Sequence, residues 1–435
     1  MLSEFKKHIE YNFPALLQSP FLLACSGGID SVVLAHLCAA CNLKFALVHC
    51  NFRLRGEESD ADEEFVKALS KELNLKYFVK GFDTEYYANL NKVSVQMAAR
   101  DLRYSWFEEL RGKEKYSYLV TAHQADDNLE TFLINLSRGT GIEGLNGITE
   151  RSSTILRPLL VFTRQDIQQY ATKNKLSWRE DSSNDDRKYL RNKIRHEIVP
   201  KLKELHPTFD KNFAKTLKYL AGTSALVDEH ISDLKKTLLQ PHKDHYRISV
   251  KELSMLSPLE PHIHAIFKEF GFTQWEDILG LLTTLSGKEV RSGTHRLIKD
   301  RDELLLQELK PGKATPDMYF LDDPDSRPPL QLLQQRVNEI SETADTILYV
   351  DKETLNDRLS VRKWQNGDYF YPLGMKGKKK VAKFFKDEKM DLIAKEAQWL
   401  LCSGNDIVWV IGRRADDRFK VTGKTKKILK ITWVE

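Results

Sequence analysis

The strongest constraint on the fold is a short apolar run that ends in a glycine pair and continues as a helix. Phe21 to Cys25 is the apolar run, residues 26–31 form the turn, and residues 31–40 have the pattern of a buried helix. A second apolar run follows at Phe45 to Cys50. A strand, a helix and a second strand in this order form a βαβ unit with parallel strands. The chain is therefore expected to begin with a parallel sheet.

The alternation of helical and strand patterns continues beyond this unit. Helical patterns cover Ser59 to Leu73 and Val95 to Leu110, and strand patterns cover Lys76 to Lys80 and Tyr118 to Ala122. Such alternation is typical of a sheet that has helices on both faces. The N-terminal region is thus predicted to be an α/β fold with a doubly wound parallel sheet.

The pattern changes near Pro207, and 435 residues exceed what one hydrophobic core usually supports. Phe209 to Leu239 reads as one long helix, and short β-like runs dominate from about Ile347. Five prolines between Pro311 and Pro329 indicate a linker. The predicted parts are a doubly wound domain (1–207), a helical connector (208–240), a mostly helical middle domain (241–330) and a small basic α+β C-terminal domain (346–435), with a helix expected from Lys379 to Lys389.

Charge is unevenly distributed along the chain. The formal net charge is +5, but residues 346–435 contain 20 Lys and Arg against 12 Asp and Glu, which gives this region +8 and leaves −3 for the rest. A basic module beside a near-neutral body suggests a polyanionic partner such as RNA. A solvated lysine-rich surface would give the same composition.

Cysteine content and hydropathy predict a cytoplasmic protein without a membrane anchor. Five cysteines, at positions 25, 38, 41, 50 and 402, are too few for a disulfide framework in a chain of this length. No apolar run approaches the roughly 20 residues that a bilayer requires. Cys38 and Cys41 have the spacing of a redox or metal pair, but without a second pair they are interpreted as packed thiols.

The turn Ser26-Gly27-Gly28-Ile29-Asp30-Ser31 has the composition of a pyrophosphate-binding loop. Glycines let backbone N–H groups approach an anion, and the N-terminus of the following helix adds its dipole. The two serines can donate further hydrogen bonds. Asp30 would repel phosphate unless a cation lay between them, so its presence predicts Mg²⁺. A Gly-Gly turn alone is often a tight connection, but the complete motif after an apolar strand predicts ATP binding.

A second polar cluster follows the strand at residues 118–122. His123 stands at the end of the strand, and Asp127 and Glu130 lie three residues apart on one face of the expected helix. Ligands bind at the carboxyl edge of a parallel sheet, which favours a functional role. The alternative is that the carboxylates cap the helix and offset its dipole.

Several arginines are candidates for binding anions. Arg100 and Arg103 are spaced so that both can reach one anion. Arg191, Asn192 and Arg195 belong to a basic helix that either faces RNA or is simply solvated. Residues 138–145 are too rich in glycine to continue a helix and are expected to form a flexible loop near the site.

In this combination the motifs resemble those of the tRNA(Ile)-lysidine synthetase family, a branch of the N-type ATP pyrophosphatases of the PP-loop superfamily. The resemblance covers nearly the whole chain. It rests on residues 26–31, 48–55, 99–104, 121–131, 138–147, 157–159 and 178–200, and on 361–368 and 372–374 near the C-terminus. Two positions depart from the family pattern, because Gln124 stands where a second His is common and Lys395 where an Arg is expected.

The resemblance implies a ligase that consumes ATP and modifies the isoleucine tRNA with a CAU anticodon. ATP would adenylate the C2 oxygen of the wobble cytidine and release pyrophosphate, and the ε-amine of free L-lysine would then displace AMP. The product, lysidine, pairs with A instead of G. Mg²⁺ is expected at Asp30, and the oligomeric state stays open, a homodimer included.

Site residues follow from the same resemblance and from the patterns above. The catalytic set is Asp30, Arg100, Arg103, His123, Asp127 and Glu130; ATP is assigned to Ser26, Gly27, Gly28, Ile29, Asp30 and Ser31; lysine is assigned to His123, Asp127 and Glu130; RNA is assigned to Arg191, Asn192, Arg195, Lys378, Lys379 and Lys380.

Three other functions use a similar loop or fold. Amidating synthetases, such as those of GMP, NAD or asparagine, usually need an ammonia source, and no candidate catalytic cysteine lies near the N-terminus. tRNA thiolation would want paired cysteines, and Cys38 with Cys41 is its only support. A non-catalytic RNA-binding protein with a relic nucleotide fold is opposed by the intact Asp30, Asp127 and Glu130.

Overall fold

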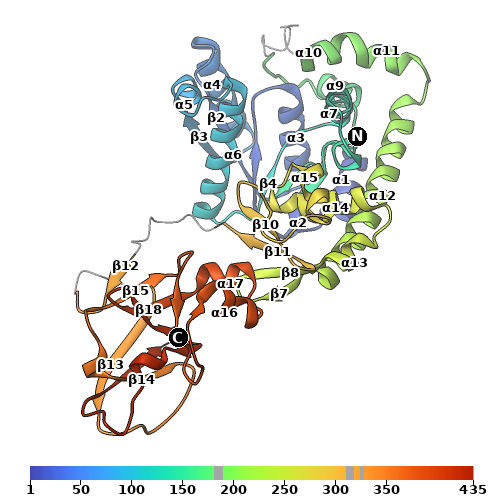
Figure 1. Cartoon of the computed structure of the whole chain (residues 1–435). Coiled ribbons are helices and arrows are strands. Elements are labelled where there is room, and N and C mark those ends of the chain that lie inside the picture. Colours follow the sequence, from blue (N-terminus) through green and yellow to red (C-terminus); the bar gives the residue numbers. More distant parts are fainter. Residues whose placement is uncertain (181–189, 310–317, 324–327, 435) are drawn as a thin grey trace. The chain divides into compact units, whose positions relative to one another are not determined.

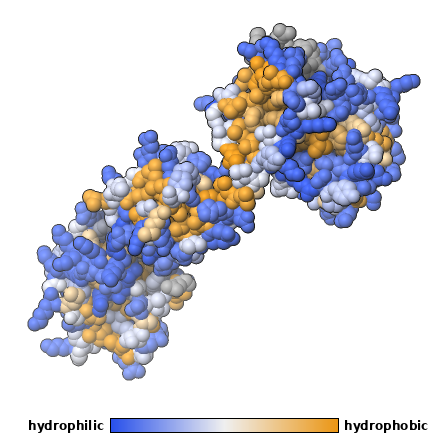
Figure 2. All heavy atoms as spheres, turned by 90° about the vertical axis from the view of Figure 1, so that its right-hand side faces the viewer, coloured by the Kyte–Doolittle hydropathy of each residue, from blue (hydrophilic) through white to orange (hydrophobic). Residues whose placement is uncertain are grey.

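The computed structural model describes residues 1–180, 190–309, 318–323 and 328–434. Contacts divide the chain into two compact units, Met1–Glu229 and His230–Glu435. The division falls inside the long helix α12 (Phe209–Leu238), in the stretch that the sequence predicts as a connector. None of the described helices is long and apolar enough to cross a membrane. On the face shown in Figure 2, hydrophobic side chains form separate areas within a largely hydrophilic surface.

Unit 1 is built on a six-stranded sheet in the order β3-β2-β1-β4-β6-β5, in which all neighbours are parallel except β5 and β6 (Figure 1). Its strands are β1 (Phe21–Ala24), β2 (Phe45–Asn51), β3 (Lys76–Gly81), β4 (Tyr118–Val120), β5 (Arg151–Ser152) and β6 (Ile155–Leu156). The chain order reverses between β1 and β4, which is where ligands bind in open α/β sheets. Both predicted site segments, 26–31 and 121–131, leave the sheet at this point.

Side chains alternate between the two faces of β1, as the period of a strand requires. Leu23 points into a core with Phe5 of α1 and Val33 of α3, whereas Leu22 points into a second core with Trp106 of α6. The sheet is therefore covered on both faces, which confirms the doubly wound prediction.

The helices of unit 1 fill the connections between strands and the region after β6. They are α1 (Leu2–Asn12), α2 (Ala15–Gln18), α3 (Ile29–Ala40), α4 (Glu57–Glu72), α5 (Thr84–Asn91), α6 (Val95–Glu114), α7 (Ala125–Arg138), α8 (Ile142–Leu145), α9 (Arg164–Lys173), α10 (Leu190–Lys193), the π-helical turn η2 (Ile194–Ile198) and α11 (Val199–Glu204). Leu129 of α7 packs against Ile194 and Val199 in a small apolar cluster. This contact holds α10 and η2 over the polar face of α7.

The first part of unit 2 combines helices with a five-stranded antiparallel sheet in the order β7-β8-β11-β10-β9. Its elements are β7 (Gln240–His242), β8 (His245–Ser249), α13 (Val250–Ser254), α14 (Leu259–Phe267), η3 (Lys268–Phe270), α15 (Trp275–Leu281), β9 (Glu289–Arg291), β10 (His295–Asp300) and β11 (Glu303–Glu308). Ile263 and Phe267 of α14 pack against Leu297 of β10 and Leu304 of β11. The expected helical middle region is present, and the sheet supplies the surface on which its helices pack.

The C-terminal part of unit 2 is rich in strands. A five-stranded sheet has the order β12-β15-β18-β19-β20, a three-stranded sheet has the order β13-β21-β14, and β16 pairs with β17. Its elements are β12 (Met318–Phe320), β13 (Gln331–Val337), β14 (Ile347–Asp351), η4 (Lys352–Thr354), β15 (Leu359–Lys363), β16 (Tyr369–Phe370), β17 (Lys379–Lys380), α16 (Val381–Asp387), α17 (Leu392–Ala397), β18 (Trp399–Ser403), β19 (Asp406–Val410), β20 (Arg414–Ala415), η5 (Asp417–Phe419) and β21 (Ile428–Val434). This agrees with the predicted small α+β domain.

Two sequence predictions in unit 2 need correction. The helix expected from Lys379 begins only at Val381, because residues 379–380 pair with β16 as a strand. The stretch 311–329, predicted as a linker, lies partly outside the described residues, but its residues 318–320 form β12 at the edge of a sheet. In the first case the lysines favour a helix, and in the second the prolines disfavour a strand. Both segments nevertheless form strands, because they pair with other segments of the chain.

Candidate active site

The loop at residues 26–31 is closed by hydrogen bonds around one hydroxyl group. Ser31 Oγ donates to the carbonyl oxygen of Gly28 (2.9 Å) and accepts from the backbone N–H of Ser26 (3.2 Å). Gly27 has φ +90°, a conformation that favours glycine, and its carbonyl oxygen accepts from the N–H of Arg179 (2.9 Å). Ser31 thus shapes the loop. The exposed Ser26 hydroxyl accepts the backbone N–H of Gly28 (3.3 Å) and lies 3.4 Å from Ser31 Oγ, on the side of the loop that a ligand can reach.

Asp30 belongs to the loop and also to the first turn of α3, which begins at Ile29. Its Oδ1 atom is buried and has no hydrogen-bond partner among the described residues. Burial, and then the negative charge of Asp127, raise the pKa of Asp30 to about 7. A buried carboxylate oxygen without a partner, beside a second carboxylate, is an arrangement that a bound cation would stabilise.

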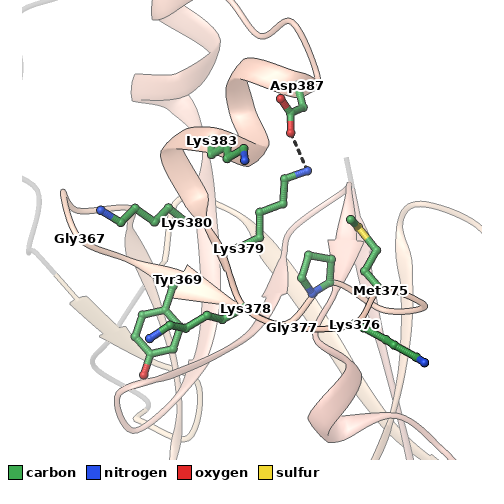
Figure 3. Close-up of a pocket in the computed structure, with 11 residues that line it drawn as sticks. Gly367, Tyr369, Met375, Lys376, Gly377, Lys378, Lys379, Lys380, Lys383 and Asp387 are labelled. Atoms are coloured by element: carbon green, nitrogen blue, oxygen red, sulfur yellow. Dashed lines mark ion pairs between the residues drawn. The ribbon is translucent and has the colours of Figure 1, made fainter.

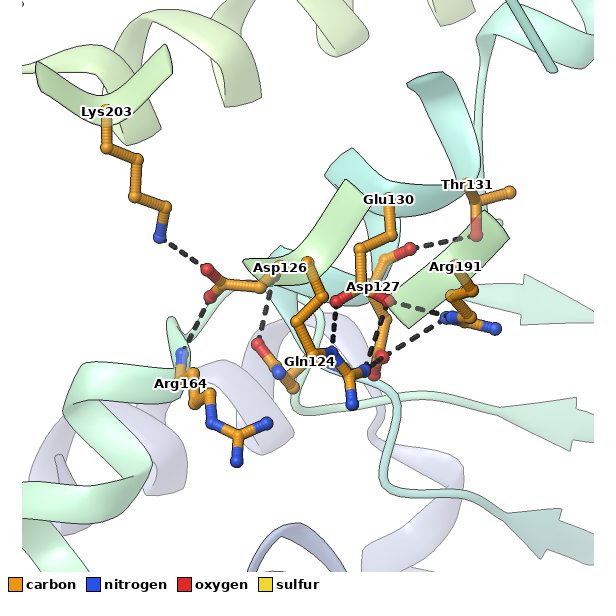
Figure 4. A network of polar contacts seen from close by, with 9 residues as sticks. Gln124, Asp126, Asp127, Glu130, Thr131, Arg164, Arg191 and Lys203 are labelled. Carbon is orange, nitrogen blue, oxygen red and sulfur yellow. Dashed lines mark hydrogen bonds and ion pairs between the residues drawn. The ribbon is translucent and has the colours of Figure 1, made fainter. Parts of the chain in front are cut away.

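Two arginines bridge the acid pair predicted on α7 (Figure 4). Glu130, which is only 1% exposed, accepts hydrogen bonds from Arg195 Nε (2.6 Å) and Arg191 Nε (2.8 Å). Asp127 Oδ1 accepts from the Nη2 atoms of Arg191 and Arg195, at 3.2 and 3.3 Å respectively. Asp127 and Glu130 therefore face one point, which in this structure holds guanidinium groups.

The carboxylates of Asp126 and Asp127, which are neighbours in α7, make different contacts. Asp127 Oδ2 accepts the backbone N–H of Gln124 (3.0 Å), and Gln124 caps the helix in return. Asp126 instead pairs with Lys203 of α11 and accepts the N–H of Arg164 (2.8 Å) at the start of α9. Asp126 thus holds α7 to α9 and α11, and Gln124 caps α7. The capping alternative applies to Asp127 in part, through one of its two oxygens.

His123 lies close to several arginines whose charges affect its pKa. Burial lowers its pKa to about 4, and the positive charges of Arg157, Arg191, Arg103 and Arg100 contribute to this shift in that order. Its Nδ1 atom lies 2.9 Å from Thr121 Oγ1. The ring is therefore neutral at pH 7. The same arginines form a positive field at the sheet edge that suits a phosphate-bearing ligand.

The structure gathers most of the predicted catalytic residues at one edge of the sheet. Asp30, His123, Asp127 and Glu130 meet there, and Arg100 and Arg103 are near enough to act on His123. Arg191 and Arg195, predicted to contact RNA, turn their guanidinium groups to the carboxylates, and Asn192 is buried. Residues 181–189, which belong to the same predicted motif, lie outside the described residues.

Sequence reasoning missed Arg157 as part of this site. It directly follows β6, the strand that neighbours β4, and its Nε is buried without a hydrogen-bond partner among the described residues. The only sequence signal was its place in the Arg157-Pro158-Leu159 segment.

A pocket of about 780 Å³ in unit 2 collects lysines from the β16–β17 hairpin and α16 (Figure 3). It is lined by Lys376, Lys378, Lys379, Lys380 and Lys383, with Asp387 as its one acidic residue. Lys379 Nζ pairs with Asp387 (2.8 Å), and Lys378 lies over the ring of Tyr369 (5.1 Å). The predicted RNA-binding lysines are therefore together on one basic surface.

Comparison with known proteins identifies relatives over nearly the whole chain. Residues 1–202 match the PP-loop domain family, residues 240–309 the TilS substrate binding domain and residues 359–433 the TilS substrate C-terminal domain. The chain is 38% identical to a tRNA(Ile)-lysidine synthase of Parabacteroides distasonis, with 95% of each chain covered. It is 35% identical to one of Bacteroides thetaiotaomicron (97% of each) and 38% identical to one of Porphyromonas gingivalis (92% and 91%). With this identity across all three matched regions, the chain belongs to the tRNA(Ile)-lysidine synthase family.

Proposed function

We propose that this protein uses ATP to join free L-lysine to C2 of the wobble cytidine of tRNA(Ile) with a CAU anticodon, forming lysidine. The observation that carries the proposal is the meeting of the loop, the partnerless carboxylate oxygen of Asp30 and the Asp127–Glu130 pair at one edge of the sheet. The first two suit ATP and its metal ion, and the third suits an amine. Residues 1–207 are the proposed catalytic domain, followed by the connector (208–240), the middle domain (241–330) and the C-terminal domain (346–435). The middle domain is proposed to bind RNA, and the C-terminal domain to bind the tRNA.

In the first step, the cytosine C2 oxygen attacks the α-phosphorus of ATP and pyrophosphate leaves. The backbone N–H groups of the loop and the N-terminus of α3 would hold the departing pyrophosphate. Arg100 and Arg103 would offset the negative charge that grows on the transferred group. Asp30 would hold Mg²⁺, which screens phosphate charge when bound, and its buried Oδ1 fits that task.

In the second step, the lysine ε-amine attacks C2 and AMP leaves. A free lysine amine has a pKa of about 10.4, so it must lose a proton before it attacks. Asp127 and Glu130 would attract the ammonium group, and Arg191 and Arg195 now lie where that group would bind. Lysine binding thus requires the two guanidinium groups to shift or to share the carboxylates, which makes α10 and η2 part of the lysine site.

The pocket of unit 2 that is lined by lysine side chains is the proposed binding surface for the tRNA backbone. Lysines at a surface neutralise phosphates and release bound counterions, so affinity falls as salt concentration rises. The target base must be unstacked before ATP can reach C2, and an anticodon loop supplies such a base at lower cost than a duplex. Arg191, Asn192 and Arg195 remain candidates for contacting the RNA near the reacting base.

Thiolation is disfavoured by the state of the cysteines. Burial raises the pKa of Cys25, Cys38 and Cys41 above the ordinary value and that of Cys50 to about 12. A raised pKa keeps a thiol protonated and poorly nucleophilic. Cys38 is completely buried in α3, as expected for a packed thiol.

The test combines the purified full-length protein with labelled lysine, ATP labelled at the α-phosphate and unmodified tRNA transcripts. The expected result is lysine incorporation into the isoleucine transcript, with AMP and pyrophosphate formed in equal amounts. The methionine transcript with the same anticodon is the matched control and should stay unlabelled. Cleavage of ATP with sulfur or ammonia, but not lysine, entering the RNA would contradict the proposal.

A further inference from the structure

Unit 2 contains an interface between the β7–β11 sheet and helix α17. Arg296 of β10 donates to Glu396 of α17 (2.6 Å), and Arg301 donates to the carbonyl oxygen of Met390 (3.3 Å). Ile298 and Leu305 pack with Ile393 in a shared apolar cluster. The two parts of the unit therefore meet through ion pairs, hydrogen bonds and apolar contacts.

Two histidines and one carboxylate meet at the edge of this interface. His242 and His245 flank the turn of the β7–β8 hairpin, and Asp391 is the N-cap of α17. Each offers one ligand atom, and these atoms all lie within 4.8 Å of one another. The two imidazole rings are 4.9 Å apart between centroids. Imidazole and carboxylate together form a donor set that zinc commonly takes.

The two histidines present nitrogen atoms that lack partners. His245 is 6% exposed, and its Nε2 is buried without a hydrogen-bond partner among the described residues, as is His242 Nδ1. A buried polar atom in this state costs free energy unless something binds it. Two such atoms on neighbouring rings, in a cluster with a buried carboxylate, indicate a shared ligand.

Asp244 sets the orientation of His245. Its Oδ1 lies 3.2 Å from His245 Nδ1, and its Oδ2 accepts a hydrogen bond from Gln307 (2.9 Å). A carboxylate facing Nδ1 places the proton there, so Nε2 keeps a free lone pair. A metal-binding histidine almost always donates its other ring N–H to a carboxylate, a carbonyl or water in this way.

Arg247 is the competing partner for the carboxylate. Its Nη2 lies 2.5 Å from Asp391 Oδ2, while Asp391 Oδ1 accepts the N–H of Ala394 (2.7 Å). A carboxylate has about four lone-pair positions, so it can serve a metal ion and these donors together. The arginine pairs with Asp391 and, at 3.8 Å, with Glu303, and it leaves both imidazole nitrogens without partners among the described residues.

We propose that His242, His245 and Asp391 bind one Zn²⁺ ion, with water as the fourth ligand, and that the ion fastens the β7–β8 hairpin to α17. Zinc bonds of about 2.0–2.2 Å place neighbouring ligand atoms roughly 3.3 Å apart, so small side-chain movements close the site. The ion would stiffen the interface between the two parts of unit 2. Its role is structural and does not depend on the reaction proposed for unit 1.

The test uses tag-free, full-length protein that has been treated with a chelator and dialysed against ZnCl₂. Elemental analysis should find about one zinc per chain, and Co²⁺ in its place should give the visible absorption of a tetrahedral site. At free zinc 100-fold above the dissociation constant, the Tm of the part that contains the site should rise by roughly 5–10 °C. If the chelator-treated protein failed to take up zinc, the proposal would be overturned. Asp391 would then serve only as the ion-pair partner of Arg247.

Variants assign the ligands. His245→Ala and Asp391→Asn should abolish the zinc-dependent rise in Tm, and Asn at 391 still accepts the Ala394 N–H that caps α17. Asp244→Asn should weaken zinc binding by about 10–100-fold, the usual effect of losing an outer carboxylate. His264→Ala, on α14, is the matched control and should bind zinc as the wild type does. Equal zinc binding by His245→Ala and His264→Ala would place the metal elsewhere and refute the assignment.

Discussion

Charged side chains are concentrated in two regions, the sheet edge of unit 1 and the lysine-lined pocket of unit 2. The two regions differ in how deeply the charges are buried and in how they are paired. At the sheet edge, Glu130 is almost fully buried and two arginines contact it. In the pocket, five lysines line an open surface, and the one ion pair that they form among the described residues joins Lys379 to Asp387. The first region holds opposite charges in direct contact, and the second has an excess of one sign.

This difference indicates that the two regions have different functions. Buried, paired charges are weakly screened by salt and define positions, which chemistry at a reacting atom requires. Exposed charges of one sign are screened and adaptable, which suits a long polyanion whose phosphates need no single arrangement. Substitutions in the two regions should therefore affect different measured quantities.

The largest effect is expected from Asp30→Asn, which keeps the shape of the side chain and removes its charge. The rate of AMP and pyrophosphate formation should fall by about 10³-fold, because the metal ion and the phosphates lose their organising carboxylate. Single-turnover assays with saturating tRNA measure this rate directly. Asp126→Asn is the control: Asp126 pairs with Lys203 instead, so its variant should lose less than about tenfold. Equal losses in the two variants would remove the special role of Asp30.

The second effect is expected from Glu130→Gln, which should separate the two steps of the reaction. Lysine incorporation should fall by about 10²-fold, while pyrophosphate release in the absence of lysine changes only a few-fold, because the amine loses half of its carboxylate pair. Both are measured on the same tRNA preparation. Thr131→Val should leave both steps unchanged, because Thr131 contributes only a hydrogen bond to the Asp127 carbonyl (2.8 Å). If Glu130→Gln slowed pyrophosphate release as much as lysine incorporation, Glu130 would not be specific to lysine.

The third effect concerns the pocket in unit 2. Lys378→Gln with Lys380→Gln should raise the KM for tRNA by roughly tenfold and leave kcat at saturating tRNA unchanged. The slope of log affinity against log salt should become shallower by about 0.7 to 0.9 for each phosphate that the variant no longer neutralises. Filter binding across a salt series measures the slope. The double variant Lys7→Gln with Lys113→Gln removes the same charge from unit 1, and an equal change there would mean that only net charge matters.

The smallest effect is a gain in stability. Because the folded pKa of Asp30 is raised to about 7, the unfolded chain ionises this group at lower pH than the folded chain does. Asp30 therefore makes its full contribution to stability at pH values below the ordinary aspartate pKa. This contribution is lost as the pH rises through about 7. Without Mg²⁺ and ATP, Asp30→Asn should raise Tm by a few degrees at pH 8 and by less at pH 5. A Tm difference that does not depend on pH would contradict the raised pKa, and Lys380→Gln should show no difference at either pH.

Much of unit 1 follows from local patterns in the sequence. The strand, loop and helix around Asp30 are predicted within a few residues, because apolar runs of a parallel sheet and the glycine turn are local signals. The spacing of Asp127 and Glu130 on α7 is equally local. Arg157 was missed, and Arg191 with Arg195 received only an RNA-binding role, because their approach to the acids depends on contacts that are distant in sequence.

Unit 2 shows the opposite balance. The sheet β7-β8-β11-β10-β9 and the edge strand β12 arise from pairing between segments whose own patterns are weak. The same applies to His242, His245 and Asp391, since the aspartate lies far along the chain from the two histidines.

The sequence by itself determined the parallel sheet, the phosphate-binding loop and the residue types of the site, because period, turn chemistry and helix spacing act over a few residues. Only the tertiary structure decided which charges are paired. It separated Asp126 from Asp127, placed two arginines on the proposed lysine site and left Asp30 Oδ1 without a partner among the described residues. The reason is physical: the state of a charge depends on burial and on its neighbours in space, and the folded chain sets both.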